Sequence, residues 1–306
     1  MDGILPLWKE RGMTSHDCVF QLRKILHTKK IGHGGTLDPE VDGVLPIAIG
    51  KGRKMLELIS QNIKIYAGEI TLGLSTTTED AYGEMVEEKK MTTPFSTDEI
   101  DRVMKLFSGD ITQIPPMYSA VKVNGRKLYE YARAGQEVKR PERQVTIYSF
   151  ERCDQPIWDS KKGIQSWHFR VVCGKGTYVR TLAVDTGKQL GIPAHMSDLT
   201  RIASGCFTKE QAVTLSEVEK LVEKKQFLDV LIPIESTVKN MPHLDLSNEL
   251  WEKIKNGRPL PFDEFELAKC PQELVALFYE NQLVSIYEPS EKQKGWLKPR
   301  KVLQTK

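Results

Sequence analysis

The chain has 306 residues, 40% of them apolar, and a net charge of +3 at pH 7. This length indicates one large domain with a small one, or two domains, and the composition suits a sizeable core. The five cysteines are scattered without C-x-x-C spacing, which argues against a zinc site or a disulfide scaffold and predicts a reducing, cytoplasmic location. We identify no signal peptide, and no apolar run approaches the roughly 20 residues of a membrane span.

Hydrophobic periodicity, helix caps and chain breakers predict the elements in chain order. Strands are expected at residues 3–8, 64–73, 121–123, 143–152, 166–173, 274–279 and 283–288, and a strand or helix start at 44–49. Helices are expected after caps at Thr14 and Ser96, and at residues 55–59, 128–134, 181–190 and 215–225. The stretch 113–120 is expected to be extended because two prolines forbid a helix there. No element is predicted at 191–214.

The composition shifts near residues 234–242. The two strands expected beyond that point are separated by a turn at Asn281. We therefore expect a large domain at residues 1–238 and a small β-rich domain at residues 239–306.

Positive charge gathers in two blocks. Residues 121–143 carry seven basic and three acidic side chains, and residues 291–306 carry six basic and one acidic. Such blocks attract polyanions, including nucleic acids. Charge alone slightly favours the alternative that both blocks are ordinary solvated surface.

The stretch at residues 30–46 is the richest in chemistry. It holds four glycines, His33, Asp38 and Asp42, and Asp38 is followed by a proline that keeps it out of a helix. Its glycines do not form the G-x-G-x-x-G or Walker A spacing, so a nucleotide-phosphate loop is not expected.

A carboxylate on such a loop suits a nucleophile at an electron-poor or anomeric carbon. Arg180 is a candidate to hold Asp38 in a two-pronged ion pair. Tyr66, Tyr118 and Tyr178 are candidates to stack on a planar base. The structural alternatives are Asp38 as a loop cap before proline, Tyr66 as packing on a sheet face, Arg180 as a surface or structural ion-pair residue, and His33 as a hydrogen-bonding loop residue.

Four sequence blocks occur in order between residues 3 and about 215. They are Gly32-His33-x-Gly35-Thr36-Leu37-Asp38-Pro39-x-x-x-Gly43-x-Leu45-Pro46; Gly73-x-x-Thr76-x-Thr78-x-Asp80-x-x-Gly83; Gln113-x-Pro115-Pro116-x-Tyr118-Ser119-Ala120-x-Lys122; and Lys175-Gly176-Thr177-Tyr178-Val179-Arg180-Thr181-Leu182 followed by Leu199-x-Arg201. Together they resemble the bacterial tRNA pseudouridine-55 synthases, the TruB family. The opening residues with Lys9 also fit this pattern, and the C-terminal module resembles the family's small PUA-like RNA-binding domain.

The resemblance implies an α+β pseudouridine-synthase fold, with a mixed, mainly antiparallel central sheet flanked by helices and loops. It implies isomerisation of uridine 55 in the tRNA T-loop to pseudouridine on a flipped-out base, without cofactor, metal, membrane or obligate protein partner, by a monomer. Asp38 is the implied nucleophile, at the uracil ring or at the ribose C1′, with Arg180 as its ion-pair partner and Tyr66 stacked on the uracil and helping proton loss from C5.

The family pattern also implies substrate-binding residues. Tyr178 and Leu199 would shape the pocket, His33 would fill the space that the flipped base leaves, and Lys9 and Asp80 would lie close to the RNA. Departures from the pattern are Glu10, Gly34, Asp42 and Thr77, none of which removes a catalytic group. Two other functions stay open: an RNA-binding or tRNA-folding protein, and a nucleoside hydrolase, which would normally show two carboxylates.

Overall fold

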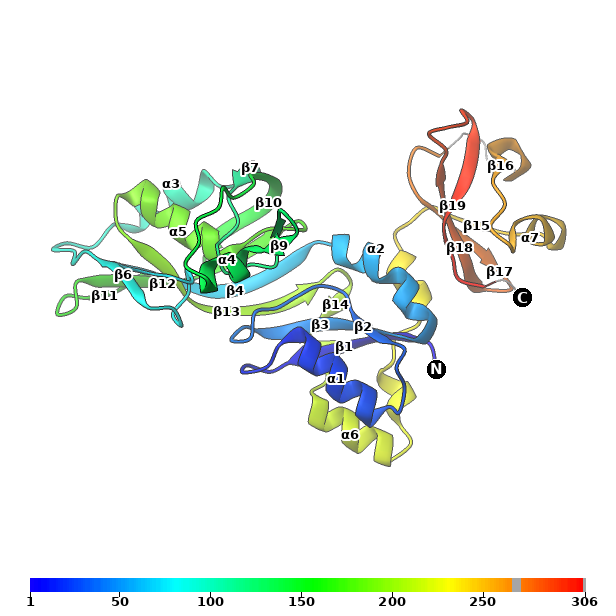
Figure 1. Ribbon diagram of the computed structural model, residues 1–306, viewed down its shortest axis with the longest axis horizontal. Helices are drawn as coiled ribbons and strands as arrows, with labels where there is room; N and C mark the ends of the chain where they lie inside the picture. The colour runs from blue at the N-terminus through cyan, green and yellow to red at the C-terminus, as the bar shows by residue number, and fades with distance from the viewer. Residues whose placement is uncertain (266–270, 305–306) are drawn as a thin grey trace.

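The protein is described by a computed structural model that covers residues 1–265 and 271–304 (Figure 1). Cys270 and Lys306, which entered the cysteine and charge arguments, lie outside these described residues. The strands of the large sheet are β1 (Gly3–Lys9), β2 (Ile31–His33), β3 (Asp42–Ile49), β4 (Lys64–Leu72), β7 (Gly109–Gln113), β10 (Arg143–Arg152), β11 (Ile157–Asp159), β12 (Ile164–Cys173), β13 (Ala194–Ser204) and β14 (Phe207–Thr208).

The spine of this sheet runs in the order β1-β3-β13-β4-β12-β10-β7. Strand β13 runs parallel to β3, whereas the other paired strands that the structure describes in this sheet are antiparallel. The predicted mixed, mainly antiparallel sheet is therefore confirmed. Two short hairpins lie outside it: β5 (Leu74–Thr76) with β6 (Met85–Glu88), and β8 (Lys122–Val123) with β9 (Arg126–Lys127).

Helices flank the sheet at its two ends. They are α1 (Ser15–Ile25), α2 (Leu56–Gln61), α3 (Thr97–Lys105), α4 (Leu128–Arg133), α5 (Val179–Leu190) and α6 (Leu215–Glu223), with the 3-10 segments η1 (Gly50–Met55), η2 (Lys209–Gln211), η3 (Phe227–Val230) and η4 (Ile234–Val238). Helices α3 and α5 pack together near β10 and β13, and α1 packs on α6 near β1 (Figure 1).

Local capping explains why several helices begin where the sequence predicts. Thr14 and Ser96 each accept a hydrogen bond from the backbone three residues ahead and receive the acidic side chain of Asp17 or Glu99 in return. This reciprocal arrangement satisfies donors that the first helical turn leaves free. Both predicted caps are confirmed.

Strand β13 is the main element that the sequence did not predict. It lies between β3 and β4 at the centre of the sheet, and its pairing with β4 shifts register between Met196 and Asp198 and again between Arg201 and Ala203. Each bulge breaks the two-residue alternation that marks a strand, and the buried positions include the polar His195 and Arg201. The sequence signal was therefore lost.

A second sheet follows, with the strand order β15-β17-β18-β19-β16. Its elements are β15 (His243–Asp245), α7 (Asn248–Ile254), β16 (Leu260–Pro261), η5 (Phe262–Phe265), β17 (Val275–Tyr279), β18 (Gln282–Pro289) and β19 (Trp296–Val302). Glu280 and Asn281 form the β17–β18 turn with positive φ angles of 49° and 61°, as the hairpin prediction requires. Among the described residues, no helix is long and apolar enough to cross a membrane.

The two sheets are joined by apolar packing and by charge. Ile59 and Met55 of the α2 region belong to one buried cluster with Leu283 and Ile286 of β18. Around this cluster, Glu57 of α2 forms ion pairs with Lys301 at 2.7 Å and with Arg300. Part of the basic C-terminal block is therefore engaged with the protein's own carboxylates.

Candidate active site

The loop at residues 34–41, between β2 and β3, is held in place by hydrogen bonds to its backbone. Ser15 Oγ accepts a hydrogen bond from Leu37 N at 2.9 Å and donates to Leu37 O at 3.3 Å. The Pro39 carbonyl accepts hydrogen bonds from Lys9 Nζ at 2.9 Å and from Gly12 N at 3.0 Å. These contacts flank Asp38 on both sides, so its backbone is fixed while its side chain remains 44% exposed.

Gly43 fixes the far end of the loop. It has a φ of +122°, and a Cβ atom there would collide with the carbonyl of Arg201, its register partner on β13. Only glycine meets both conditions without strain. The loop is therefore joined to the central strand of the sheet at this residue.

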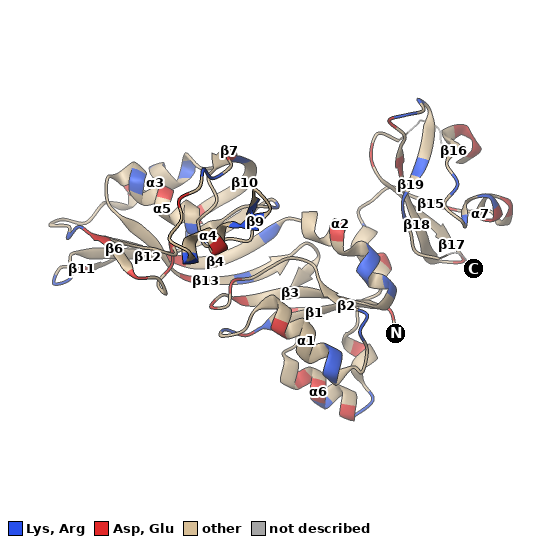
Figure 2. Ribbon diagram, in the orientation of Figure 1, with Lys and Arg blue, Asp and Glu red and all other residues tan. Residues whose placement is uncertain are grey.

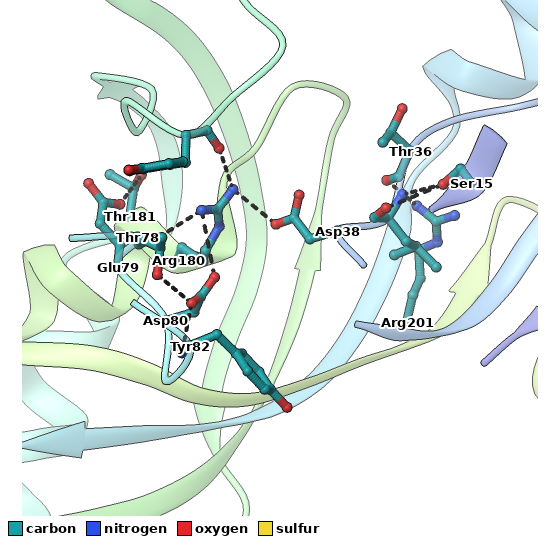
Figure 3. A network of polar contacts seen from close by, with 12 residues as sticks. Ser15, Thr36, Asp38, Thr78, Glu79, Asp80, Tyr82, Arg180, Thr181 and Arg201 are labelled. Atoms are coloured by element: carbon teal, nitrogen blue, oxygen red, sulfur yellow. Dashed lines mark hydrogen bonds and ion pairs between the residues drawn. The ribbon is translucent and has the colours of Figure 1, made fainter. Parts of the chain in front are cut away.

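Asp38 and Arg180 meet although they are far apart in the sequence. Arg180 Nη2 lies 2.9 Å from Asp38 Oδ2, as Figure 3 shows. The same guanidinium donates from Nη1 to the carbonyl of Thr78 at 2.7 Å and from Nη2 to that of Tyr118 at 2.9 Å. This differs from the symmetrical two-pronged pair that the sequence predicted, because the backbone carbonyls take up both terminal nitrogens.

Arg180 is oriented by its surroundings before any ligand is present. The side chain of Gln113 clamps the backbone of Tyr178, accepting from its N at 3.0 Å and donating to its O at 3.2 Å, at the start of α5. Asp80 Oδ2 lies 3.7 Å from Arg180 Nη1, while Asp80 Oδ1 accepts from Thr78 Oγ1 and Tyr82 N. Asp80 thus organises the turn behind Arg180.

Two hollows adjoin the Asp38–Arg180 pair. The first is a cavity of about 300 Å³, which we call the inner cavity, and it is lined in part by Asp38, Tyr66, Tyr178, Arg180 and Leu199. Pockets for small ligands begin at about this volume. The second, of about 380 Å³, shares Asp38, Arg180 and Leu199 and adds aromatic and basic side chains, including Tyr82, Tyr118, Tyr129 and Arg133.

The structure thus brings together six of the site residues proposed from the sequence: five line the inner cavity, and Asp80 lines the second hollow beside Arg180. Tyr66 lies on β4 and is 8% exposed, and burial raises the pKa of its phenol. Leu199 is 7% exposed on β13. The phenol is therefore in the protonated form at neutral pH.

Lys64, Ser119 and Arg201 also line the inner cavity, and sequence reasoning gave them no role. Lys64 was detectable in principle, because it stands two residues before Tyr66 on a predicted strand and residues at this spacing share one face of a strand. Arg201 was not, because no strand is predicted where it lies. Ser119 lies in an irregular segment, where spacing carries no such signal.

Lys9 and His33 lie elsewhere. The Lys9 ammonium is fully buried under the loop, where it donates to the carbonyls of Glu10, Met13 and Pro39, and burial lowers its pKa. His33 is half-buried on β2 and donates from Nδ1 to the Gly35 carbonyl, and burial lowers the pKa of its imidazole. Neither residue lines the two hollows as the structure describes them.

Comparison with known sequences decides the family. The N-terminal domain model of the TruB family of pseudouridylate synthases matches residues 23–179, and the tRNA pseudouridylate synthase B C-terminal domain model matches residues 180–239. The chain belongs to the TruB family. Curated relatives named tRNA pseudouridine synthase B include those of Ligilactobacillus salivarius, Listeria innocua and Bacillus pumilus, which are 51%, 51% and 49% identical over 99% of this chain and 98–99% of theirs.

Solved structures agree with this TruB assignment. The chain resembles Cbf5 in a Cbf5-Nop10-Gar1 complex at 28% identity and a TM-score of 0.75, covering 99% of this chain and 85% of that one. It also resembles a chain of an H/ACA RNP bound to a substrate RNA containing 2′-deoxyuridine, at 26% identity and a TM-score of 0.72, with the same coverage. The pseudouridine-synthase fold is therefore confirmed.

Three of the four residues that depart from the TruB pattern have local explanations. A Cβ atom at Gly34 would lie 2.6 Å from Ile59 Cγ2 of α2, so this chain leaves no room there for a larger side chain while Ile59 keeps its position. Asp42 accepts a hydrogen bond from Thr200 Oγ1 at 2.5 Å. Thr77 Oγ1 accepts from Glu84 N at 3.1 Å. These contacts leave the Asp38–Arg180 pair intact.

Proposed function

We propose that the protein isomerises uridine 55 in the T-loop of tRNA to pseudouridine, with Asp38 as the nucleophile; it would then be a tRNA pseudouridine(55) synthase. The observation that carries this proposal is the Asp38 carboxylate held 2.9 Å from Arg180 at the edge of a cavity that Tyr66 and Leu199 line. The tRNA substrate follows the names of relatives that are about half identical over nearly the whole chain.

Two routes start from the same carboxylate. If Asp38 attacks C1′, a carboxylate oxygen bonds to C1′ while the N1–C1′ bond breaks and its electron pair stays on the base. If it attacks the ring at C6, the ring takes up the electron pair and the glycosidic bond breaks afterwards. In both routes the base turns over, C5 bonds to C1′, the carboxylate is released, C5 loses its proton and N1 gains one.

Tyr66 faces the ring in this proposal. Its aromatic face offsets part of the stacking energy lost when a base is flipped out, which is a few kcal/mol. As a proton acceptor at C5 it would have to ionise, and burial opposes that by raising its pKa. The burial of Tyr66 therefore favours stacking on the uracil ring over accepting the C5 proton.

The other site residues proposed from the sequence take supporting roles. Tyr178 and Leu199 wall the cavity and exclude water, which would otherwise compete for C1′. Asp80 supports Arg180, Lys9 holds the Asp38 loop, and His33 fills the stack that the base vacates. We propose that the enzyme acts in the cytoplasm as a monomer, needs no cofactor or metal, and uses residues 239–306 as a second RNA contact.

The test is mapping of pseudouridine at base resolution in unmodified tRNA after incubation with the protein. Asp38→Asn and Asp38→Ala should form no product while tRNA binding persists. Asp110→Asn is the matched control, because Asp110 is an exposed carboxylate bonded to Thr146 on β10, and it should retain wild-type activity. Product formation by Asp38→Ala would overturn the assignment, and release of free uracil would indicate a hydrolase instead.

A second role in tRNA folding is favoured by one observation. Basic side chains lie over tyrosine rings on and beside α4: Arg126 over Tyr131 at 4.6 Å, and Arg133 over Tyr129 at 5.3 Å from the ring centroid. Figure 2 shows basic residues gathered around α4 and β9. Such a surface binds unpaired RNA by stacking and charge. Rescue of misfolded tRNA by Asp38→Ala would support this role. If Asp38→Ala does not rescue it, catalysis is the only role proposed.

A further inference from the structure

The wall of the inner cavity contributed by β4 and β13 carries two buried cations. Lys64 is 7% exposed and Arg201 is 1% exposed, and both line this cavity together with Asp38. Arg201 is the register partner of Tyr66 across β4 and β13, and Lys64 lies two residues from Tyr66 on the same strand face. Arg201 therefore lies beside Tyr66, and Lys64 lies on the same face of β4 as Tyr66.

Both cations have hydrogen-bonding capacity left over. Lys64 Nζ donates to the carbonyls of Ser60 at 2.6 Å and Asn62 at 2.7 Å, which uses two of its three donors. Arg201 donates from Nε to the Val44 carbonyl at 2.8 Å and from Nη1 to that of Thr36 at 3.3 Å. Arg201 Nη2 is buried and has no partner at hydrogen-bond geometry among the described residues, although the Arg201 side chain also acts on the phenol of Tyr66.

A buried donor without a partner costs folding free energy, so its retention calls for an explanation. The carboxylate in this cavity does not provide one. Asp38 turns toward Arg180 in Figure 3, while Arg201 extends toward Thr36 on the other side. Arg180 is thus the cation that pairs with Asp38, and Lys64 and Arg201 face the rest of the cavity.

We propose that Lys64 and Arg201 stabilise the negative charge that the uracil ring acquires during the isomerisation. This inference rests on the proposed function of Asp38. When N1–C1′ breaks, its electron pair stays on the base, and the charge spreads over N1 and the two carbonyl oxygens. Attack at C6 also moves an electron pair into the ring, so the charge appears in either route.

The burial of the cations suits this role. Donors that are fixed in place before the reaction and aimed at developing charge act strongly in a site of low dielectric, and removing one such donor typically lowers the rate by about 10²–10³-fold. The Lys64 amine also gives a readout, because burial lowers its pKa to about 8.

The expected pH dependence has a definite sign. Below about pH 8 Lys64 is charged, and above it the charge is lost. The other groups that act on this amine are Arg201, Cys173 and Lys175, and burial raises the pKa of Cys173 to about 11. If the charge assists catalysis, kcat/KM should fall as pH rises through about 8, and Lys64→Arg should remove that fall.

The experiment measures single-turnover isomerisation and RNA binding with a T-loop stem-loop at saturating protein. Lys64→Met should slow the reaction by about 10²-fold with nearly unchanged binding, and Lys64→Arg should recover part of the rate. The matched control is Lys162→Met, which removes the same charge from an exposed turn between β11 and β12 whose residues are not among those that line the cavity as described. It should keep the wild-type rate of the chemical step.

A second substrate separates electrostatic from structural effects. A stem-loop with 5-fluorouridine at the target position carries an electron-withdrawing group that stabilises a ring anion by itself. Lys64→Met should therefore slow cleavage of the N-glycosidic bond more in the uridine stem-loop than in the 5-fluorouridine stem-loop. Equal slowing of both substrates, or a wild-type rate in Lys64→Met, would overturn the proposal.

Two further variants keep these outcomes interpretable. If Lys64→Met unfolds below the assay temperature, the rates of Arg201→Lys on the two substrates are compared in the same way. Asp38→Ala is assayed in parallel: activity in that variant would refute the nucleophile, whereas inactivity together with a wild-type rate in Lys64→Met would refute only the role of the cations.

Discussion

Arg180 reaches Asp38 with the same nitrogen, Nη2, that donates to the carbonyl of Tyr118, while Nη1 donates to the carbonyl of Thr78. One planar group therefore aligns the carboxylate with two loops that are 40 residues apart. Arginine presents five donors in a rigid fork, which lysine does not. The orientation of Asp38 depends on this fork as well as on its charge.

Arg180→Lys should accordingly lower the single-turnover rate by about 10²-fold although it keeps the positive charge. RNA binding should change little, because Arg180 is 6% exposed and offers little surface to phosphates. The matched control is Arg152→Lys. Arg152 forms a true two-pronged pair with Asp101, at 2.9 and 2.8 Å, and is not among the residues that line the inner cavity as described. Similar rates in both variants would contradict the orienting role.

Gly43→Ala should destabilise the fold by more than about 3 kcal/mol, because strain at positive φ is added to a collision with the β13 backbone. Urea unfolding followed by circular dichroism measures this loss. Gly125→Ala is the control: its φ is +84°, yet a Cβ atom there meets nothing within 4 Å among the described atoms. It should cost only the backbone strain, about 1 kcal/mol. Comparable losses at both positions would show that the contact with β13 is unimportant.

Stability should decrease slightly as pH rises above the ordinary histidine pKa of 6.5 because of His168. Its Nδ1 lies 2.6 Å from Asp154 Oδ2, and this hydrogen bond raises its pKa above the usual value of 6.5. A raised folded-state pKa stabilises the fold fully below the unfolded-state pKa, and the gain disappears as pH passes the folded-state value. The pair is half exposed, so the effect should be at most about 1 kcal/mol. Unfolding midpoints of wild type and His168→Gln should converge at high pH; a constant difference would argue against the pair.

Glu57→Gln should loosen the C-terminal sheet without unfolding it. The variant loses the attraction between α2 and both Lys301 and Arg300, while the apolar cluster beneath remains. Hydrogen exchange of the β19 amides should become faster, and the wild-type rates should approach those of the variant as salt screens the pairs. Glu252→Gln removes an ion pair within the small module, with Lys255, and should leave β19 unaffected. Unchanged exchange in Glu57→Gln would mean that apolar contacts alone hold the sheets together.

Most of the fold was predictable because local signals and tertiary packing agree. The capping residue Ser96 and the alternation along β4 both mark real elements. The failure at β13 has a physical cause. Its two bulges shift the side chains out of alternation, and Arg201 is stabilised inside the sheet by backbone carbonyls that no local pattern reveals.

The site was only partly predictable for the same reason. Asp38 stands out through its glycine-rich loop and the proline after it, and Arg180 through its place beside Tyr178 on a second glycine-containing turn. The burial of Lys9 and the inward position of Lys64 depend on which carbonyls come within reach after folding. A lysine on a strand is ordinarily expected to be exposed, so charge alone pointed to the surface.

The contact between Gly34 and Ile59 couples two positions that the sequence keeps 25 residues apart. Sequence changes at these positions should therefore occur together. A larger residue at 34 can be accepted when residue 59 becomes smaller, and Ile59 also belongs to the apolar cluster shared with β18. The choice of side chain in the loop that carries Asp38 is thus limited by how the C-terminal sheet is attached. Grafting this loop into a relative would succeed only if helix α2 and its partner surface were transferred with it.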